Sequence, residues 1–201
     1  MLIESVEERE CDFLMAKETK HKLWREETIA TESIYQGTFL SMQVDTVSLA
    51  DGRTVSREIV KHPGAAAVIA LLDGKLIVVD QFRKAIDKFQ IEIPAGKLDA
   101  NEDPIVAAGR ELEEETGYRA KNLTLINSFY TSPGFSNQKT YLYFTDDVER
   151  GVQSLDDDEE IVVEAITIEQ ADAYIAEGRI SDAKTIVAVY AWKQYLLSGK
   201  L

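Results

Sequence analysis

Residues 96–118 read GKLDANEDPIVAAGRELEEETGY, and this stretch decides how the chain is organised. Asp103 is a suitable N-cap, and Pro104 suits the first position of a helix. Gly117 suits the left-handed residue that follows a helix end. The stretch therefore predicts a helix from about Pro104 to Thr116.

The predicted helix has two different faces. Helical periodicity places Ile105, Ala108 and Leu112 together, and we expect these side chains to pack against the core. Glu111 and Glu115 are four residues apart and project together from a neighbouring face. On composition alone, the acidic run ELEEE is typical of a solvated helix face. Carboxylates at this spacing are also hard oxygen ligands, which suit Mg²⁺ or Mn²⁺ better than Zn²⁺.

The residues around these carboxylates favour a built site over a solvated face. The loop before the helix offers the backbone carbonyl of Ala95 as a further oxygen ligand. Arg110 can reach Glu114 one turn later, or fold back toward Glu102. In either position we expect the arginine to orient carboxylates and to take no part in the chemistry.

Length, charge and cysteine content limit the class of protein. The chain has 201 residues, enough for one domain with an appended element, and 45% of them are hydrophobic. Its net charge of -14 opposes tight binding to nucleic acid. Cys11 is the only cysteine, which excludes an intrachain disulfide and indicates a reducing compartment. Because the chain has no signal-peptide pattern and no apolar run long enough to span a membrane, we expect a cytoplasmic protein without a membrane partner.

Strand patterns surround the predicted helix. Residues 1–60 form an N-terminal segment in which strands begin at Ile34 and a hairpin turns at Ala50-Asp51-Gly52. Residues 61–201 form the main domain, where a second hairpin turns at Asp73-Gly74. Its first strand is apolar throughout and is expected to be buried on both faces. Further predicted elements are strands at 65–72, 75–82, 89–96, 123–132, 139–146 and 160–167 and helices at about 167–177 and 182–197. The pattern predicts an α/β fold with a mixed sheet sandwiched between helices.

Nine fixed positions in the opening stretch resemble a Nudix box: Gly96, Glu102, Arg110, Glu111, Leu112, Glu114, Glu115, Gly117 and Tyr118. Pro133 of the SPGF segment follows Gly117 by sixteen residues, which is similar to the ADP-ribose pyrophosphatase branch of Nudix hydrolases. The segments REIVKHPGA and QFRKAIDK also resemble that branch. The resemblance implies the Nudix fold and Mg²⁺-dependent hydrolysis of ADP-ribose to AMP and ribose 5-phosphate. It also implies a homodimer in which residues 1–60 are the dimerisation element.

The resemblance further implies a set of metal ligands and a general base. The ligands would be the carbonyl of Ala95, the carboxylates of Glu111 and Glu115, and an acidic residue of the loop at 156–160. In that loop, Glu159 corresponds to the metal position and Asp157 to the base position. Glu160 and, on the helix, Glu114 remain candidates for the base. The alternative is that the run Asp156–Glu160 is only a solvated turn.

Substrate contacts implied by the resemblance are Arg57 and Arg83 near the adenine and the phosphates, Tyr35 as an N-terminal contact, and Gly134, Phe135 and Gln138 in the SPGF loop. The ordinary alternative for either arginine is a solvated surface charge. Phe135 could line the base or ribose pocket, or cover the core as a lid. Gln138 stands where many members of the branch have glutamate, and its amide can still hydrogen-bond a ribose hydroxyl.

Two other functions are consistent with the same residues. A Nudix pyrophosphatase could prefer GDP-mannose, NADH or another nucleoside-diphosphate derivative. A catalytically silent Nudix domain could bind ADP-ribose as a sensor, although such a domain would usually carry a damaged box. A substrate panel distinguishes these functions from ADP-ribose hydrolysis.

Overall fold

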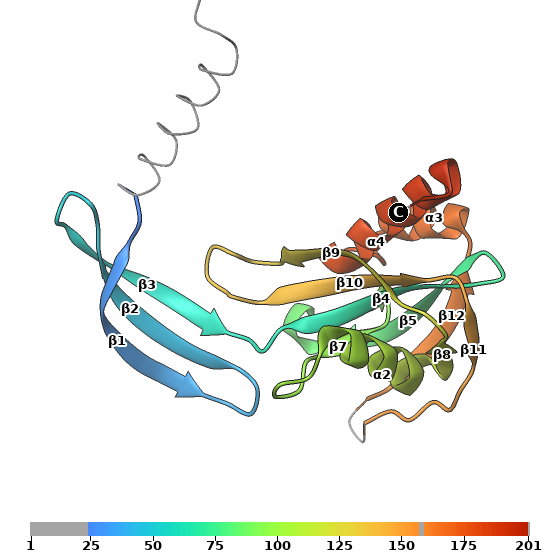
Figure 1. The fold of residues 1–201 in the computed structure, drawn as a ribbon, viewed down its shortest axis with the longest axis horizontal. Coiled ribbons are helices and arrows are strands. Elements are labelled where there is room, and N and C mark those ends of the chain that lie inside the picture. The colour runs from blue at the N-terminus through green and yellow to red at the C-terminus, as the bar shows by residue number, and fades with distance from the viewer. Residues whose placement is uncertain (1–23, 157–158, 201) are drawn as a thin grey trace, which may run out of the picture. The chain divides into compact units, whose positions relative to one another are not determined.

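The computed structural model describes residues 24–156 and 159–200, so Cys11 and Asp157 lie outside the described residues. The chain divides into two compact units, Met1–Lys61 and His62–Leu201, which are described separately (Figure 1). Among the described residues, no helix is both long and apolar enough to cross a membrane.

The first unit contains a three-stranded antiparallel sheet of β1 (Glu27–Gln36), β2 (Ser41–Ser48) and β3 (Thr54–Lys61) in that order. The hairpin predicted at Asp51-Gly52 is confirmed, and Gly52 adopts a φ of 84°, which favours glycine. The prediction that strands begin at Ile34 was wrong, because β1 starts seven residues earlier. Every residue of β1 is exposed, so no buried face imposes the apolar alternation by which a strand is recognised.

The second unit is built on a seven-stranded mixed sheet. Its main path runs β12-β5-β4-β10-β9, with β6 beside β5 and β7 beside β4. Only the β4–β10 pair is parallel. The strands are β4 (Ala65–Leu72), β5 (Lys75–Arg83), β6 (Lys88–Glu92), β7 (Ala95–Lys97), β9 (Thr124–Tyr130), β10 (Lys139–Thr145) and β12 (Ile161–Ile166). A separate two-stranded sheet pairs β8 (Tyr118–Ala120) with β11 (Val148–Arg150), and a 3-10 turn, η1 (Lys84–Ile86), joins β5 to β6.

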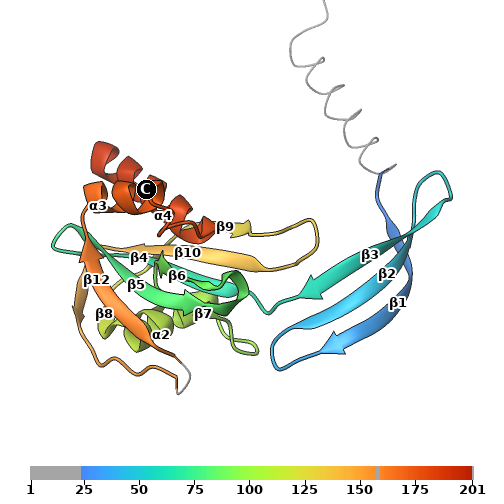
Figure 2. The ribbon, with the colours of Figure 1, turned by 180° about the vertical axis from the view of Figure 1, so that it is seen from behind.

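Helices cover both faces of this sheet, as the α/β prediction required (Figures 1 and 2). On one face, α2 (Pro104–Thr116) packs Ala107, Ala108 and Leu112 against β4 and its neighbours. On the other face lie α3 (Ile168–Ala176) and α4 (Ala183–Ser198), which contribute the fully buried Trp192. The predicted burial of β4 on both faces is confirmed, because seven of its eight residues are buried.

The helix predicted from the opening stretch is confirmed at both ends. The carboxylate of Asp103 accepts a hydrogen bond from N of Ile105 at 3.1 Å, and Gly117 adopts the left-handed conformation with φ 69°. One core residue was wrong: Ile105 is 41% exposed, and Ala107 is buried instead. Ile105 lies in the first turn of α2, before Ala107, which is the first buried residue of the helix.

Candidate active site

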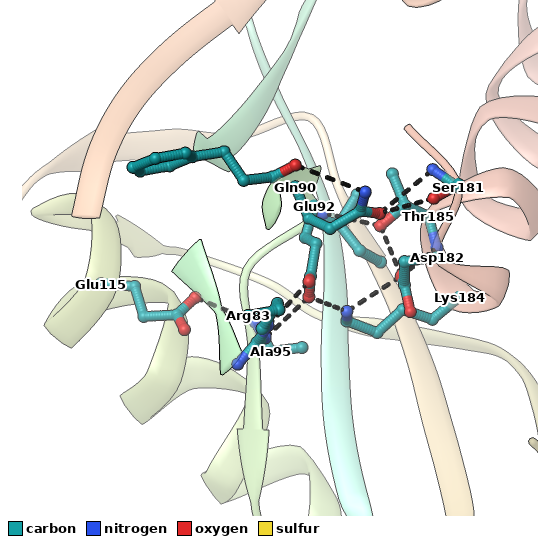
Figure 3. A network of polar contacts seen from close by, with 11 residues as sticks. Arg83, Gln90, Glu92, Ala95, Glu115, Ser181, Asp182, Lys184 and Thr185 are labelled. Carbon is teal, nitrogen blue, oxygen red and sulfur yellow. Dashed lines mark hydrogen bonds and ion pairs between the residues drawn. The ribbon is translucent and has the colours of Figure 1, made fainter. Parts of the chain in front are cut away.

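The two carboxylates predicted to share a helix face lie at the end of α2 beside β7. Glu115 is 3% exposed, and its Oε2 accepts a hydrogen bond from N of Ala95 at 3.0 Å (Figure 3). The Glu111 carboxylate lies against Gly96. A β-carbon at residue 96 would stand only 1.9 Å from Cδ of Glu111, so glycine is what allows this close approach.

Both carboxylates resist ionisation without a bound cation. Burial raises the pKa of Glu115 to about 8, against the hydrogen bond from Ala95, and the charges of Glu111 and Glu159 act in the same direction as burial. Burial also raises the pKa of Glu111, and the neighbouring Arg110 offsets only part of that rise. Both carboxyl groups therefore keep their protons to a higher pH than an ordinary glutamate does.

Arg110 fulfils both alternatives that its position in the sequence allows. Its Nε and Nη2 each donate to the Glu102 carboxylate at 3.0 Å. Its Nη1 donates to Glu111 at 2.8 Å and to Glu114 at 2.9 Å, and Nη2 also donates to the carbonyl of Lys97 at 3.2 Å. One guanidinium therefore holds three carboxylates and the preceding loop in a fixed arrangement.

The donor set suits a hard divalent cation. Two carboxylates of raised pKa and the adjacent backbone of Ala95 provide the oxygen ligands that Mg²⁺ and Mn²⁺ prefer. Across residues 24–156 and 159–200, however, no three acidic, histidine or cysteine side chains stand close enough to hold a metal by themselves. A cation here would need backbone oxygen, water or phosphate ligands in addition to Glu111 and Glu115, which is the usual situation for Mg²⁺.

Among the described residues of the acidic loop, Glu159 contributes to the electrostatic field of this site. The charge of Glu159 raises the pKa of both Glu111 and Glu115. The backbone N of Glu159 donates to the carbonyl of Asp156 at 3.0 Å. Glu159 and Glu160 are both exposed, and Glu114 is 42% exposed at its side chain while paired with Arg110. Which of these acids serves as the base stays a prediction.

Arg83 belongs to a charged cluster that the sequence did not indicate (Figure 3). Its Nε and Nη2 donate to the two oxygens of Glu92 at 2.8 and 2.7 Å. Lys184 of α4 forms an ion pair with the same carboxylate from the other side. Although burial opposes ionisation, these two cations lower the pKa of Glu92 to about 2. The sequence offers only the charged Glu92 between the apolar Ile91 and Ile93 as a signal, and its partner Lys184 is ninety-two residues away in the chain.

The SPGF loop connects β9 to β10 and is held by its own backbone. N of Phe135 and N of Ser136 both donate to the carbonyl of Ser132, at 3.2 and 2.9 Å, and N of Gln138 donates to the Ser136 hydroxyl at 3.2 Å. Phe135 is 56% exposed, so the interpretation of it as a lid on the core is wrong. The roles of Gly134, Phe135 and Gln138 toward a substrate stay predictions.

Arg57 and Tyr35 belong to the first unit. Nε of Arg57 donates to Glu26 at 3.0 Å, and 43% of the arginine side chain is exposed. Tyr35 is 59% exposed on β1. Both side chains are therefore accessible within their own unit, and their expected contacts with a substrate stay predictions.

Comparison with known proteins gives consistent matches over most of the chain. The NUDIX domain model matches residues 61–188. The chain is similar to the "Methanol dehydrogenase activator" of Bacillus methanolicus, with 47% identity over 178 residues that cover 87% of this chain and 94% of that protein. It is similar to the "ADP-ribose pyrophosphatase" of Bacillus subtilis (strain 168), with 45% identity over 178 residues and the same coverage of both chains.

A solved structure agrees with the fold. The structure described as "Crystal structure of ADP compounds hydrolase" superposes with a TM-score of 0.78 and covers 88% of this chain and 97% of that chain. Its sequence is 16% identical, so this likeness concerns the architecture alone.

Proposed function

The chain belongs to the NUDIX family and is a Nudix hydrolase, and from this premise we propose that it hydrolyses the pyrophosphate bond of ADP-ribose to AMP and ribose 5-phosphate, using Mg²⁺ or Mn²⁺. The observation that carries the proposal is the pair Glu111 and Glu115, held beside Ala95 with raised pKa values. The 45% identity to an ADP-ribose pyrophosphatase supports the choice of substrate.

The metal would be held by the carboxylates of Glu111 and Glu115, the carbonyl of Ala95, and oxygen ligands from water or the phosphates of the substrate. Glu159 does not stand close enough to form a three-acid group with them, and its role as a ligand stays a prediction. When bound, the metal would act as a Lewis acid that neutralises the charge of the pyrophosphate oxygens. Arg110 keeps Glu111 in place through its hydrogen bonds to Glu102 and Glu114. The chain therefore supplies a set of acidic side chains held in fixed positions. These side chains would repel a phosphate alone and would bind a phosphate together with its cation.

The remaining residues would bind the substrate and move one proton. Arg83 donates to a phosphate oxygen, because its guanidinium is charged and partly exposed. Water attacks one phosphorus, the bridging P–O bond breaks, and the second phosphate leaves with the bridging oxygen. The proton of the attacking water passes to a carboxylate of the loop at 156–160, since Glu111 and Glu115 would be engaged with metal. The SPGF loop, Arg57 and Tyr35 would contact the adenine and ribose groups.

A second candidate function comes from the printed name of the Bacillus methanolicus relative, which is slightly more similar than the pyrophosphatase. Activation of an alcohol dehydrogenase would require either contact with that enzyme or cleavage of a nucleotide that it uses. The acidic site of this chain favours cleavage, because it is built around ionisable oxygen ligands and not around an apolar docking surface.

A substrate panel tests the proposal. Purified protein with Mg²⁺ is mixed separately with ADP-ribose, GDP-mannose, NADH and NAD⁺, and kcat/KM is measured for each from product release. We expect ADP-ribose to have the highest value. Cleavage of GDP-mannose or NADH without cleavage of ADP-ribose would show that the proposed substrate is wrong. No cleavage of any compound in the panel would favour a module that binds ADP-ribose without hydrolysing it.

A homodimer is predicted from the first unit. Its β1 strand exposes Ile29, Ile34 and Tyr35, which are 56%, 50% and 59% accessible. Exposed apolar side chains on a small sheet favour association, because a partner subunit can cover them. Light scattering at micromolar concentration should give twice the mass of the 22.5 kDa chain, and Ile34→Glu should reduce it. A wild-type monomer under these conditions would contradict the prediction.

A further inference from the structure

The buried ion cluster behind Arg83 links the C-terminal helix to the proposed phosphate site. Glu92 of β6 is almost completely buried, with 4% of its side chain exposed, and Lys184 of α4 is 12% exposed. Arg83, by contrast, is 41% exposed. The cluster, whose contacts Figure 3 shows, therefore has a buried carboxylate, a largely buried lysine and a partly exposed arginine.

The geometry fixes the plane of the Arg83 guanidinium. Its Nε and Nη2 occupy the two oxygens of Glu92 as a fork, at 2.8 and 2.7 Å. Within the described part of the chain, Nη1 makes no hydrogen bond, so this edge is available for a ligand. The charges of Glu92, Glu115 and Asp182 all stabilise the charged form of Arg83 and raise its pKa. Arg83 therefore stands in the electrostatic field of the carboxylate that would hold metal.

Lys184 connects Glu92 to the N-terminus of α4. Its ammonium group is also bound to Asp182 at 2.9 Å, and Asp182 is the N-cap of α4. Asp182 accepts hydrogen bonds from N and Oγ1 of Thr185 at 2.9 and 2.8 Å, and Thr185 Oγ1 in turn accepts one from N of Ile93 at 3.0 Å. The ammonium group is thus fixed to both the helix and the strand.

We propose that Glu92 and Lys184 are positioning residues that hold the Arg83 guanidinium with one edge toward the phosphates of a nucleoside diphosphate; this inference rests on the proposed function. Because Lys184 also neutralises the Glu92 carboxylate, that carboxylate cancels less of the positive charge that Arg83 presents to the ligand. Lys184 also holds the carboxylate back, because a carboxylate paired with Arg83 alone could follow the arginine or swing between rotamers. Pre-organisation of this kind lowers the entropic cost of binding.

A double-mutant cycle on ligand affinity tests the inference. The probe is ADP, which contains the pyrophosphate group and adenosine without requiring turnover, and its Kd is measured by calorimetry in Mg²⁺ buffer. The variants are Lys184→Met, Arg83→Ala and the double variant. The control is Lys193→Met, which removes another paired lysine of α4 whose partner is Asp172. Lys184→Met is expected to weaken ADP binding by at least about fivefold, and Lys193→Met is expected to leave it unchanged.

The double variant distinguishes positioning from general damage. If Lys184 acts through Arg83, the double variant binds ADP no more weakly than Arg83→Ala alone. Three results would each overturn the inference. The first is additive losses of ADP affinity in the double variant, and the second is a Kd of Lys184→Met within about twofold of wild type. The third is an Arg83→Ala protein that binds ADP as tightly as wild type.

Two further variants protect the test against misfolding. Lys184→Arg keeps the charge and should retain most of the affinity. Asp182→Asn keeps an N-cap residue and removes the charge that anchors Lys184, so a smaller loss of ADP affinity is expected. If Lys184→Met does not fold, an Asp182→Asn protein with wild-type affinity overturns the inference. ADP binding is measured without hydrolysis, so the two proposals can fail separately. Failure to cleave ADP-ribose would contradict the proposed function, whereas the Kd values for ADP decide this inference.

Discussion

Glu115→Gln is expected to lower kcat for ADP-ribose on the order of a thousandfold, the scale seen when a group that stabilises transition-state charge is removed. The amide has nearly the same size and can still accept the hydrogen bond from N of Ala95. It lacks the charge that a divalent cation requires. Steady-state kinetics at saturating Mg²⁺ measure the effect.

Glu113→Gln is the matched control for this prediction. Glu113 lies on the same helix two residues earlier, but it pairs with Arg119 on the exposed side. Its kcat should stay close to wild type. Thermal unfolding adds a second readout, because Mg²⁺ that binds only the folded state should raise the Tm of the wild type and raise that of Glu115→Gln less. A Glu115→Gln enzyme with wild-type kcat would show that this carboxylate holds no catalytic metal.

Neutralising one acid of the loop at 156–160 is expected to lower kcat by at least about a hundredfold with little change in KM, the usual scale of a positioned general base. The physical reason is that Glu111 and Glu115 would be engaged with metal and thus poor proton acceptors. A separate carboxylate must take the proton of the attacking water. The variants are Asp157→Asn, Glu159→Gln and Glu160→Gln, each assayed at saturating ADP-ribose and Mg²⁺.

Rate profiles against pH distinguish a base from a metal ligand among these variants. Loss of the base should remove the acidic limb of the kcat profile, whereas loss of a ligand should raise the Mg²⁺ concentration needed for half-maximal rate. Glu149→Gln is the control, because Glu149 is an exposed acid of β11 that lies outside the acidic loop. Near-normal kcat in all three variants would indicate that the loop is only a solvated turn without a catalytic role. The base would then have to be sought among Glu114 and Glu102.

The parts of the fold that the sequence predicted are those whose burial follows a local period. The run at 65–72 is apolar throughout, and β4 is indeed buried on both faces. Asp103 and Gly117 marked the ends of α2 because capping depends on single residues. The strand β1 lacked any such signal, since none of its residues is buried. The predicted burial of Ile105 was wrong because helical spacing indicates which residues share a face of the helix. It does not indicate how far along the helix that face is buried.

The candidate site divides in the same way. Glu111 could be paired with Glu115, and Arg110 with Glu114, from spacing alone, because residues four apart on a helix are neighbours. The pairing of Glu92 with Lys184 could not be foreseen, since it joins β6 to a helix ninety-two residues later through tertiary packing. The loop at 156–160 offers several equivalent carboxylates, and a run of identical charge carries no pattern that selects one of them.

Hydrolysis of ADP-ribose with and without metal tests the central claim most directly. The protein is incubated with ADP-ribose in Mg²⁺ buffer and in the same buffer with excess EDTA, and both products are quantified by chromatography. We expect AMP and ribose 5-phosphate in equal amounts with Mg²⁺, no product with EDTA, and recovery of hydrolysis when Mg²⁺ is restored. Intact ADP-ribose in the presence of Mg²⁺ and Mn²⁺, or equal product release in EDTA, would contradict this claim.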